Sequence, residues 1–453
     1  MNEDKEFLGT EPIGKLLLRL ALPTLAAQII NMLYNIVDRI YIGHIPHVGA
    51  AALTGVGVCM PLIMIVSAFA ALVGYGGSPR ASIYLGKKDV ESAEKILGNC
   101  FTMQILVSLI LTAVLIIWNR DLLLAFGASE NTIPYANSYM NLYALGTLFV
   151  ELTLGMNAFI TTQGFAKTGM YSVLIGAVAN IILDPVFIFG FHMGVSGAAT
   201  ATVLSQTASC AFVLKTLFGK TVPVRITFGG YDWRLIRRIL TIGFTPFIII
   251  AMDNVMIITM NAILQKYGGA ARGDLLITCA TIAQSFMLVV TMPLGGITSG
   301  TQAVLAYNFG AGNTDRVKGA QKYIFILAAA YTTLLFILAR TVGGLFVRLF
   351  TSDPTVAAEA LRAIRIFTLA IIPLAFQYEI VDGFTGLGQV QVALPLSFFR
   401  KGLYFVSLFL LPAMFGAEAA FFAEPVSDIA GPVVSAIVYI VSMKGILAKA
   451  GEN

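Results

Sequence analysis

Apolar residues occur in long runs along most of the chain, and Gly, Pro and clusters of charged residues interrupt these runs at intervals. A helix needs about 20 mostly apolar residues to cross a bilayer. With that length as the measure, the pattern predicts twelve membrane-spanning helices. The predicted spans cover residues 16–43, 49–77, 94–118, 133–162, 170–190, 195–218, 236–266, 275–303, 320–346, 357–386, 393–415 and 420–444.

The most polar stretch of the chain interior lies between the sixth and seventh predicted spans, over residues 219–238. Its basic residues are Lys220, Arg225, Arg234, Arg237 and Arg238. A basic, turn-rich segment between two sets of six spans is typical of a connection on the cytoplasmic side. We therefore predict a lobe over 1–218, a cytoplasmic linker over 219–235 and a second lobe over 236–453.

The composition agrees with a membrane location. Apolar residues make up 57% of the 453 residues and charged residues only 12%, with a mean hydropathy of +0.84. Soluble domains carry roughly 25% charged residues. This deficit excludes an ordinary cytosolic enzyme, a disordered protein and a nucleic-acid-binding protein, and it leaves a multi-pass protein of the lipid bilayer.

The distribution of basic residues predicts the orientation. If the N-terminus is cytoplasmic, eight of the 29 Lys and Arg residues fall on the outer side and the other 21 on the inner side. The positive-inside rule then places both termini in the cytoplasm, with the protein in the plasma (inner) membrane. The first 15 residues are polar and acidic, so we expect no cleaved signal peptide. The four cysteines form no CxxC pair and are expected to be free thiols.

The two halves resemble each other. An offset of 224 residues aligns Tyr84-Leu85-Gly86-Lys87 with Asn308-Phe309-Gly310-Ala311, in each case after the second span of a half. Because six spans are an even number, both halves cross the membrane in the same direction. They are then related by a pseudo-two-fold axis along the membrane normal, with a cavity between them. This organisation favours an alternating-access transporter over a channel or a receptor.

Several catalytic motifs are absent. The chain has no GxxxxGK[ST] sequence, so nothing supports ATP-driven pumping, and no cofactor is expected. It also lacks HExxH and GxSxG, which leaves hydrolase chemistry without a metal site or a nucleophile. The sequence does not indicate an enzyme.

Acidic residues inside the predicted spans are the strongest functional candidates. A carboxylate within the bilayer costs several kcal/mol unless it binds a proton, a cation or a partner. The candidates are Asp38, Glu151, Asp184, Asp253, Glu379, Asp382, Glu424 and Asp428. We expect Glu151 to be held by neighbouring helices more readily than to function, and Glu424 and Asp428 to face water or a helix end.

Asp38 and Asp184 have the most informative surroundings in the first half. Tyr34 lies one helical turn before Asp38, and Asn180 lies one turn before Asp184. Pro185 is expected to free a backbone carbonyl one turn back. The next span supplies the hydroxyl of Thr202. These oxygens suit Na⁺, or a proton shared by the two acids. The alternative is that both acids only hydrogen-bond to neighbouring helices.

Three acids of the second half are weaker candidates. Asp253 lies in the seventh predicted span, and Glu379 and Asp382 lie three residues apart on one face of the tenth. They could receive a cationic substrate or form a second coupling site. Equally, they could pair with Arg400, with Lys401 or with each other.

Together these residues resemble the multidrug and toxic compound extrusion (MATE) family, in the branch related to DNA-damage-inducible protein F and to the staphylococcal multidrug exporters. The resemblance rests on Leu20-Ala21-Leu22-Pro23, Tyr34-Asn35-Ile36-Val37-Asp38, Asn180-Ile181-Ile182-Leu183-Asp184-Pro185, residues 194–202, Ala306-Tyr307-Asn308-Phe309-Gly310-Ala311-Gly312, Gly386-Leu387-Gly388 and Pro425-Val426-Ser427-Asp428.

The resemblance implies an all-α, V-shaped antiporter of twelve helices that exports organic cations against entering Na⁺ or H⁺. It gives cation-ligand roles to Asp38, Asn180, Asp184 and Thr202. Asp253 fits the place of an acid on the seventh span of the norfloxacin-extruding branch. The tenth-span acid of that branch aligns near Phe376 or Gln377, so Glu379 and Asp382 do not match it.

The leading hypothesis is therefore a monomeric secondary antiporter for organic cations that binds no nucleic acid. The alternative within transport is a flippase for lipid-linked precursors. Such a flippase would need basic residues to meet a pyrophosphate, whereas acids outnumber Lys and Arg in the middle parts of the predicted spans. The sequence leaves the choice between Na⁺ and H⁺ open.

Overall fold

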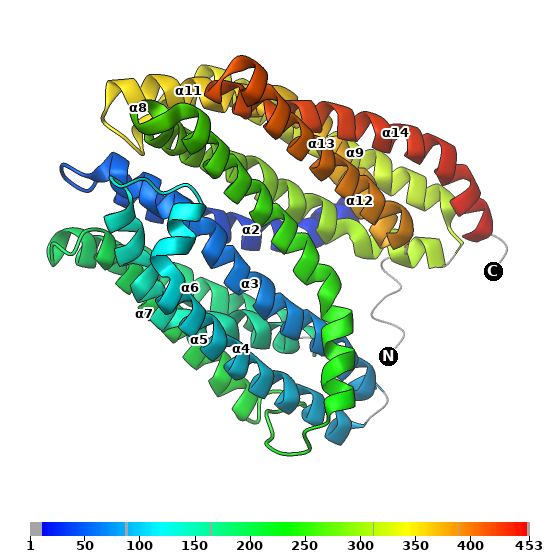
Figure 1. Cartoon of the computed structure of the whole chain (residues 1–453). Coiled ribbons are helices and arrows are strands. Elements are labelled where there is room, and N and C mark those ends of the chain that lie inside the picture. Colours follow the sequence, from blue (N-terminus) through cyan, green and yellow to red (C-terminus); the bar gives the residue numbers. More distant parts are fainter. Residues whose placement is uncertain (1–10, 87–88, 164, 311, 388, 451–453) are drawn as a thin grey trace. The chain divides into compact units, whose positions relative to one another are not determined.

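The computed structural model describes residues 11–86, 89–163, 165–310, 312–387 and 389–450, and contains no strand within them (Figure 1). The helices of the first part of the chain are α2 (Ile13–Gly43), α3 (Gly49–Gly86), α4 (Val90–Ala125), α5 (Ile133–Thr162), α6 (Ala166–Pro185), the π-helix η2 (Val186–Gly190) and α7 (Val195–Phe218). The later helices are α8 (Trp233–Gly310), α9 (Thr314–Thr341), α10 (Gly343–Arg348), α11 (Pro354–Phe367), the 3₁₀-helix η3 (Thr368–Ala370), α12 (Ile371–Gly386), α13 (Val390–Phe415), the 3₁₀-helix η4 (Ala417–Phe422) and α14 (Ala423–Ala450).

The helical pattern confirms the predicted fold class. In the part of the chain that the structure describes, eleven helices are long and apolar enough to cross a membrane. The remaining predicted span, 16–43, lies within α2. Two spans have the predicted limits, since α5 covers 133–162 and α7 covers 195–218.

Other predicted spans are interrupted in the structure by a break, a division or a change of helix type. α8 contains both the seventh and the eighth predicted spans, and it breaks at Gly269, whose φ of +60° is accessible to glycine at little cost. The tenth predicted span is divided into α11, η3 and α12. After Pro185, which has no N–H to donate, α6 widens into the π-turn η2, where the Phe191 N–H donates to the Val186 carbonyl at 2.9 Å.

Large apolar side chains on the outside of the bundle support the membrane location. On α4, Leu106, Ile110 and Ile117 are each more than half exposed, and on α14 so are Ile429 and Val433. Their spacing of four or seven residues places each set on one helix face. Such apolar faces are unfavourable in water and are ordinary for helices in contact with lipid.

Contacts divide the chain into two compact units. The N-terminal unit comprises residues 34–265 and 269–278, and the C-terminal unit comprises the described residues up to 33 together with 266–268 and those from 279 onward. α2 thus contributes its first part to one unit and its second part, from Tyr34, to the other. The predicted lobe limits at 218 and 236 remain a prediction.

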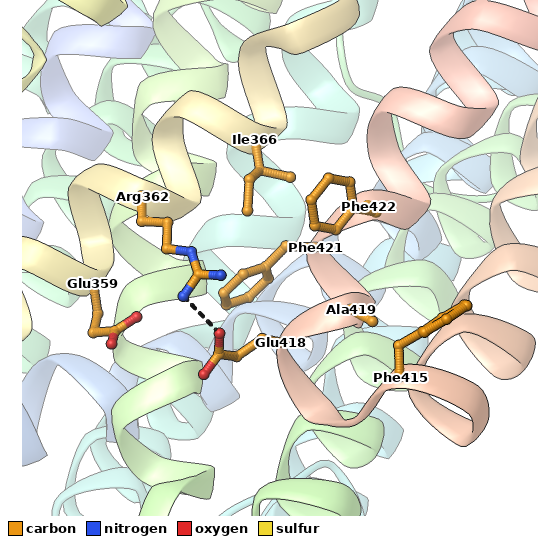
Figure 2. Close-up of a pocket in the computed structure, with 8 residues that line it drawn as sticks. All are labelled: Glu359, Arg362, Ile366, Phe415, Glu418, Ala419, Phe421 and Phe422. Atoms are coloured by element: carbon orange, nitrogen blue, oxygen red, sulfur yellow. Dashed lines mark hydrogen bonds and ion pairs between the residues drawn. The ribbon is translucent and has the colours of Figure 1, made fainter.

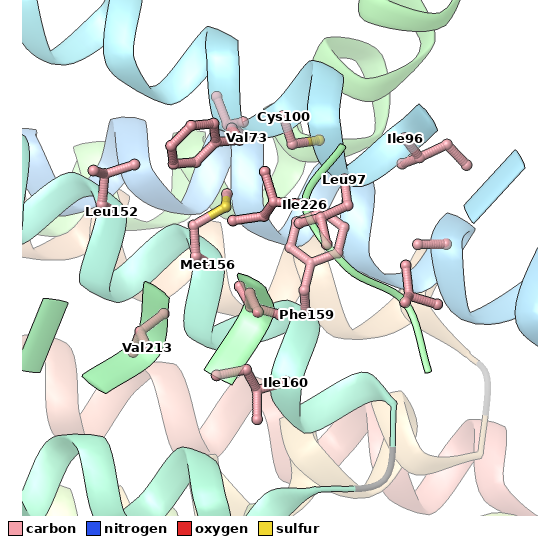
Figure 3. Close-up of a cluster of buried hydrophobic side chains, with 14 of the residues drawn as sticks. Val73, Ile96, Leu97, Cys100, Leu152, Met156, Phe159, Ile160, Val213 and Ile226 are labelled. Carbon is pink, nitrogen blue, oxygen red and sulfur yellow. The ribbon is translucent and has the colours of Figure 1, made fainter. Parts of the chain in front are cut away.

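Within the N-terminal unit, α5 is the central helix and contacts α3, α4, α6 and α7. Figure 3 shows its apolar core, in which Leu152 and Met156 of α5 lie with Cys100 of α4 and Val213 of α7. Cys59, Cys100, Cys210 and Cys279 are all free and buried, as expected.

The segment between α7 and α8 packs onto this unit. The amide of Gln163 pairs with the backbone of Val224, accepting from its N–H at 2.8 Å and donating to its carbonyl at 3.2 Å. Ile226 is buried in the apolar core (Figure 3). α8 begins at Trp233, two residues before the predicted end of the linker. The connection is therefore attached to the N-terminal unit over much of its length.

The C-terminal unit is built around α12, which contacts α9, α13 and α14. Its core joins Leu16 and Leu17 of α2 to Ile324 of α9, Phe384 of α12 and Leu447 of α14, all of them buried. This arrangement places one face of α12, which carries Glu379, inside the unit.

Candidate functional site

Four residues predicted to bind the coupling cation lie together in the N-terminal unit. α2 supplies Asp38, α6 supplies Asn180 and Asp184, and α7 supplies Thr202. Their exposed fractions are 6%, 0%, 0% and 3% respectively. Segments separated by more than 140 residues in sequence therefore form one enclosed polar cluster.

Asn180 holds the cluster together. Its Nδ2 donates to Asp184 Oδ1 at 3.2 Å and to Thr202 Oγ1 at 3.4 Å. The carboxyl groups of Asp38 and Asp184 also lie close enough to interact directly. Two carboxyl groups this close to each other favour the binding of a proton or a cation.

Several oxygens of the cluster have no protein donor. Asp38 Oδ1, Asp184 Oδ2 and Asn180 Oδ1 are buried and accept no hydrogen bond. Buried acceptors are normally satisfied, and oxygen ligands of this kind suit a hard cation or a proton. Within the residues that the structure describes, no group of three or more His, Cys, Asp or Glu could hold a metal ion.

Two tyrosines complete the surroundings. Tyr34, expected from the sequence, makes side-chain hydrogen bonds with Thr202 and Gln206. Tyr139 of α5, which the sequence analysis did not select, also hydrogen-bonds to Thr202. The available signal was the spacing of Tyr139 and Tyr143 by four residues, which puts two hydroxyls on one face of an apolar helix.

The predicted acids of the later spans lie elsewhere. Asp253 of α8 is exposed, so it is not part of the buried cluster. Glu379 and Asp382 of α12 belong to the C-terminal unit. Glu379 is 1% exposed, and neither of its carboxylate oxygens has a hydrogen-bond partner. Asp382 accepts a hydrogen bond from the Thr298 hydroxyl at 2.5 Å.

Asp428 corrects one expectation. It was predicted to face water or a helix end, but it is 0% exposed and forms an ion pair with Arg400 at 2.8 Å. The first residues of α14 pack against α13, which carries Arg400. Arg400 therefore binds Asp428. The sequence analysis had offered Arg400 as a partner of Glu379 or Asp382.

A small cavity of about 190 Å³ in the C-terminal unit lies apart from these acids. Its polar lining comes from Arg362 of α11, which donates to Glu418 of η4 at 2.8 Å, and from Glu359 (Figure 2). Phe421 and Phe422 cover its apolar side. None of the predicted site residues lines this cavity.

Comparison with known proteins identifies the family. The MatE family model matches residues 23–186 and 250–410, which together make up most of the chain. The chain is 24% identical over 421 residues to the multidrug export protein MepA of Staphylococcus haemolyticus, covering 92% of this chain and 91% of that protein.

Solved structures show the same fold. A multidrug resistance MATE family transporter of the MOP superfamily in an inward-facing conformation superimposes with a TM-score of 0.85 at 21% identity, covering 94% of this chain and 98% of the other. Such a transporter in an outward-facing conformation gives a TM-score of 0.75 at 21% identity, with 98% and 99% covered. The chain is a multi-pass membrane protein and a transporter, not an enzyme, and it belongs to the MatE family.

Proposed function

We propose that this transporter exports drug-like organic cations in exchange for entering Na⁺ or H⁺. The observation that carries the proposal is the buried pair of Asp38 and Asp184, whose free oxygens require a proton or a cation. Membership of the MatE family and the likeness to a multidrug export protein support the choice of cargo. The absence of a nucleotide-binding motif from the sequence supports secondary transport.

The coupling site works through charge. A cation or proton that reaches Asp38 and Asp184 neutralises two carboxylates which are otherwise costly to bury. Asn180 orients Asp184, while Tyr34 and Thr202 complete the oxygen lining. Because α2, α6 and α7 meet at this point, neutralisation changes how these helices attract one another. That change allows the transporter to alternate its access between the two sides of the membrane, and so to exchange the ion for the organic cation.

The acids of the second half form a second binding site, for the substrate or for the coupling ion. Glu379 is buried with both oxygens free, and Asp382 lies one turn further along the same helix, α12. A cation near them would satisfy oxygens that no protein donor reaches. Asp253, being exposed, is positioned to meet a cation before it is enclosed.

The orientation of the protein in the membrane follows from the distribution of its basic residues. Both termini lie in the cytoplasm, because 21 of the 29 basic residues then fall on the inner side of the plasma membrane. The protein works as a monomer, since the coupling site is built from helices of one chain.

The deciding experiment is transport of ethidium by the purified protein in liposomes. Na⁺ and pH gradients are imposed separately on the wild type, on Asp184→Asn and on Asp121→Asn, an exposed aspartate that serves as a matched control. We expect one gradient to drive dye movement, Asp184→Asn to abolish it and Asp121→Asn to retain it.

Two outcomes would contradict the proposal. Coupled transport that survives in Asp184→Asn would exclude the site. A folded wild type that moves no dye under either gradient would exclude organic cations as cargo, and lipid-linked or anionic substrates would then be tested.

A further inference from the structure

A third acidic side chain is enclosed in the N-terminal unit, in addition to Asp38 and Asp184. Glu151 of α5 is 0% exposed and lies against Gln104 of the neighbouring helix α4. Gln104 Nε2 donates to Glu151 Oε2 at 2.5 Å and to the Glu151 backbone carbonyl at 3.0 Å. The acid is thus held at a fixed position near the middle of α5.

The pair lacks one proton donor. Glu151 Oε1 and Gln104 Oε1 are both buried and both without a hydrogen-bond partner. While Glu151 is ionised, both of these oxygens can accept hydrogen bonds but neither can donate one. A proton on Glu151 Oε1 supplies a donor within the same pair. A neutral carboxyl beside a carboxamide is the arrangement in which both groups can both donate and accept.

The surroundings of Glu151 offer no compensating charge. In the described part of the chain, no Lys or Arg forms an ion pair with it. The titratable group facing it is Tyr143 of α5, while α4 contributes the neutral Gln104 and α3 the backbone at Gly74, which packs on Gly155. An isolated buried carboxylate is costly, so the environment favours a bound proton.

Hydroxyl groups on α5 lie along the helix between this acid and Tyr139, although the Thr147 hydroxyl donates to the backbone carbonyl of Tyr143 at 3.5 Å. Tyr139, Tyr143, Thr147 and Glu151 are spaced by four residues and are all buried on one helix face. The rings of Tyr139 and Tyr143 are stacked, with their centroids 6.4 Å apart, a separation at which aromatic rings still attract each other. Tyr139 reaches the coupling site through its hydrogen bond to Thr202. Twelve residues of helix separate Tyr139 from Glu151, or about 18 Å.

The second half of the chain contains a similar arrangement. Glu379 of α12 is also buried, Gly383 follows it by four residues as Gly155 follows Glu151, and Gln321 comes from α9. A Cβ atom on Gly383 would lie 3.1 Å from Gln321 Nε2 and 3.6 Å from Glu379 Oε1. In both halves, an acid and a glutamine amide lie next to one glycine. We interpret this repetition as a sign of function, and not of chance packing.

We propose that Glu151, paired with Gln104, is a second proton-binding site that exchanges its proton with the Asp38–Asp184 pair along the hydroxyl face of α5. The inference rests on the proposed antiport and specifies H⁺ as an ion it uses. Each hydroxyl accepts a proton on its oxygen and passes its own proton onward. An O–H bond breaks at the aspartate pair and one forms at Glu151 Oε1, without any redox change.

Glu151→Gln is the critical variant, because it removes the exchangeable proton and keeps the contact. A glutamine at 151 can accept from Gln104 Nε2 and donate to Gln104 Oε1, so the fold should be retained. We expect this variant to lose ethidium transport driven by a pH gradient while ethidium binding persists. In infrared difference spectra between low and high pH, it should also lose the carbonyl band of the protonated Glu151 carboxyl, which the wild type and Asp184→Asn both show.

Tyr143→Phe tests the connection by deleting one hydroxyl on the α5 face. Ser209→Ala is its control, since Ser209 is an equally buried hydroxyl that donates to the Ser172 carbonyl and lies on α7. We expect Tyr143→Phe to slow transport driven by a pH gradient and Ser209→Ala to leave it unchanged.

The outcomes separate this inference from the proposed function. If Asp184→Asn loses transport while Glu151→Gln keeps both transport and the infrared band, the Glu151 site is wrong and the antiport stands. If Asp184→Asn keeps coupled transport, the antiport proposal itself fails. If Glu151→Gln does not fold, a wild-type spectrum without the carboxyl band, or an unaffected Tyr143→Phe, would overturn the inference.

Discussion

Glu151 in the N-terminal unit and Glu379 in the C-terminal unit meet a glutamine in different ways. Gln104 donates to Glu151 at 2.5 Å. Gln321 donates no hydrogen bond, because its Nε2 has no partner, while its Oε1 accepts from the Tyr439 hydroxyl at 2.9 Å. One oxygen of the first acid is thus closed by its amide, whereas both oxygens of the second acid remain open.

A third acid shows what a permanent partner does. Asp428 is as buried as Glu151, but its partner is the guanidinium of Arg400. Gly431, three residues later, leaves room for the Arg400 side chain, since a Cβ there would lie 2.8 Å from it. An acid paired with arginine stays charged and has a structural role. Burial alone therefore does not distinguish these acids from one another, whereas their partners do.

The largest effect on stability should come from Asp428→Asn. Removing one member of a buried ion pair leaves Arg400 uncompensated, and such changes cost about 3–5 kcal/mol. The free energy of unfolding in detergent measures this loss. The double variant Arg400→Met/Asp428→Leu, which removes both charges, should recover most of it. A double variant as unstable as Asp428→Asn would show that the charge pair is not the cause.

Glycine substitutions should separate the two glutamate sites. A Cβ on Gly155 would lie 2.6 Å from Gln104 Nε2 and would displace the amide from Glu151. The lost hydrogen bonds outweigh the gain in helix propensity, so Gly155→Ala should reduce the free energy of unfolding by about 1–2 kcal/mol. Gly383→Ala displaces an amide that donates to nothing, and it should change stability by less than about 1 kcal/mol. Equal losses in the two variants would contradict the closed and open description.

The smallest effects should come from the helix caps of the two units. Asp353 caps α11 in the C-terminal unit by accepting from the Thr355 N–H at 2.7 Å, and Asp353→Ala should cost about 1 kcal/mol of unfolding free energy. Asp89 caps α4 in the N-terminal unit, where hydrogen bonds from Ser92 hold the pKa of its carboxyl below the ordinary value. Its contribution is present above the ordinary pKa of an aspartate and is lost as the pH falls through the lowered value. Unfolding curves of Asp89→Asn that keep the wild-type acid dependence would contradict this assignment.

The coupling site shows how far local sequence reasoning reaches. Asn180 and Asp184 are one helical turn apart, so their contact follows from helix geometry alone. Asp38 and Thr202 were joined to them as candidates because acids and hydroxyls are rare in apolar spans, and in the structure both side chains are buried with them. Tyr139 was missed, since its place beside Thr202 depends on how α5 packs against α7.

The sequence by itself determined the approximate spans and the fold class, and it named the acids within the spans. Hydropathy is sufficient for this because a bilayer requires about 20 apolar residues per helix and penalises every charge within it. Only the tertiary structure decided which of these acids are buried, and that Gln104 is the partner of Glu151 and Arg400 the partner of Asp428. These partners come from different helices, and no periodicity along one helix encodes the side-chain packing between helices.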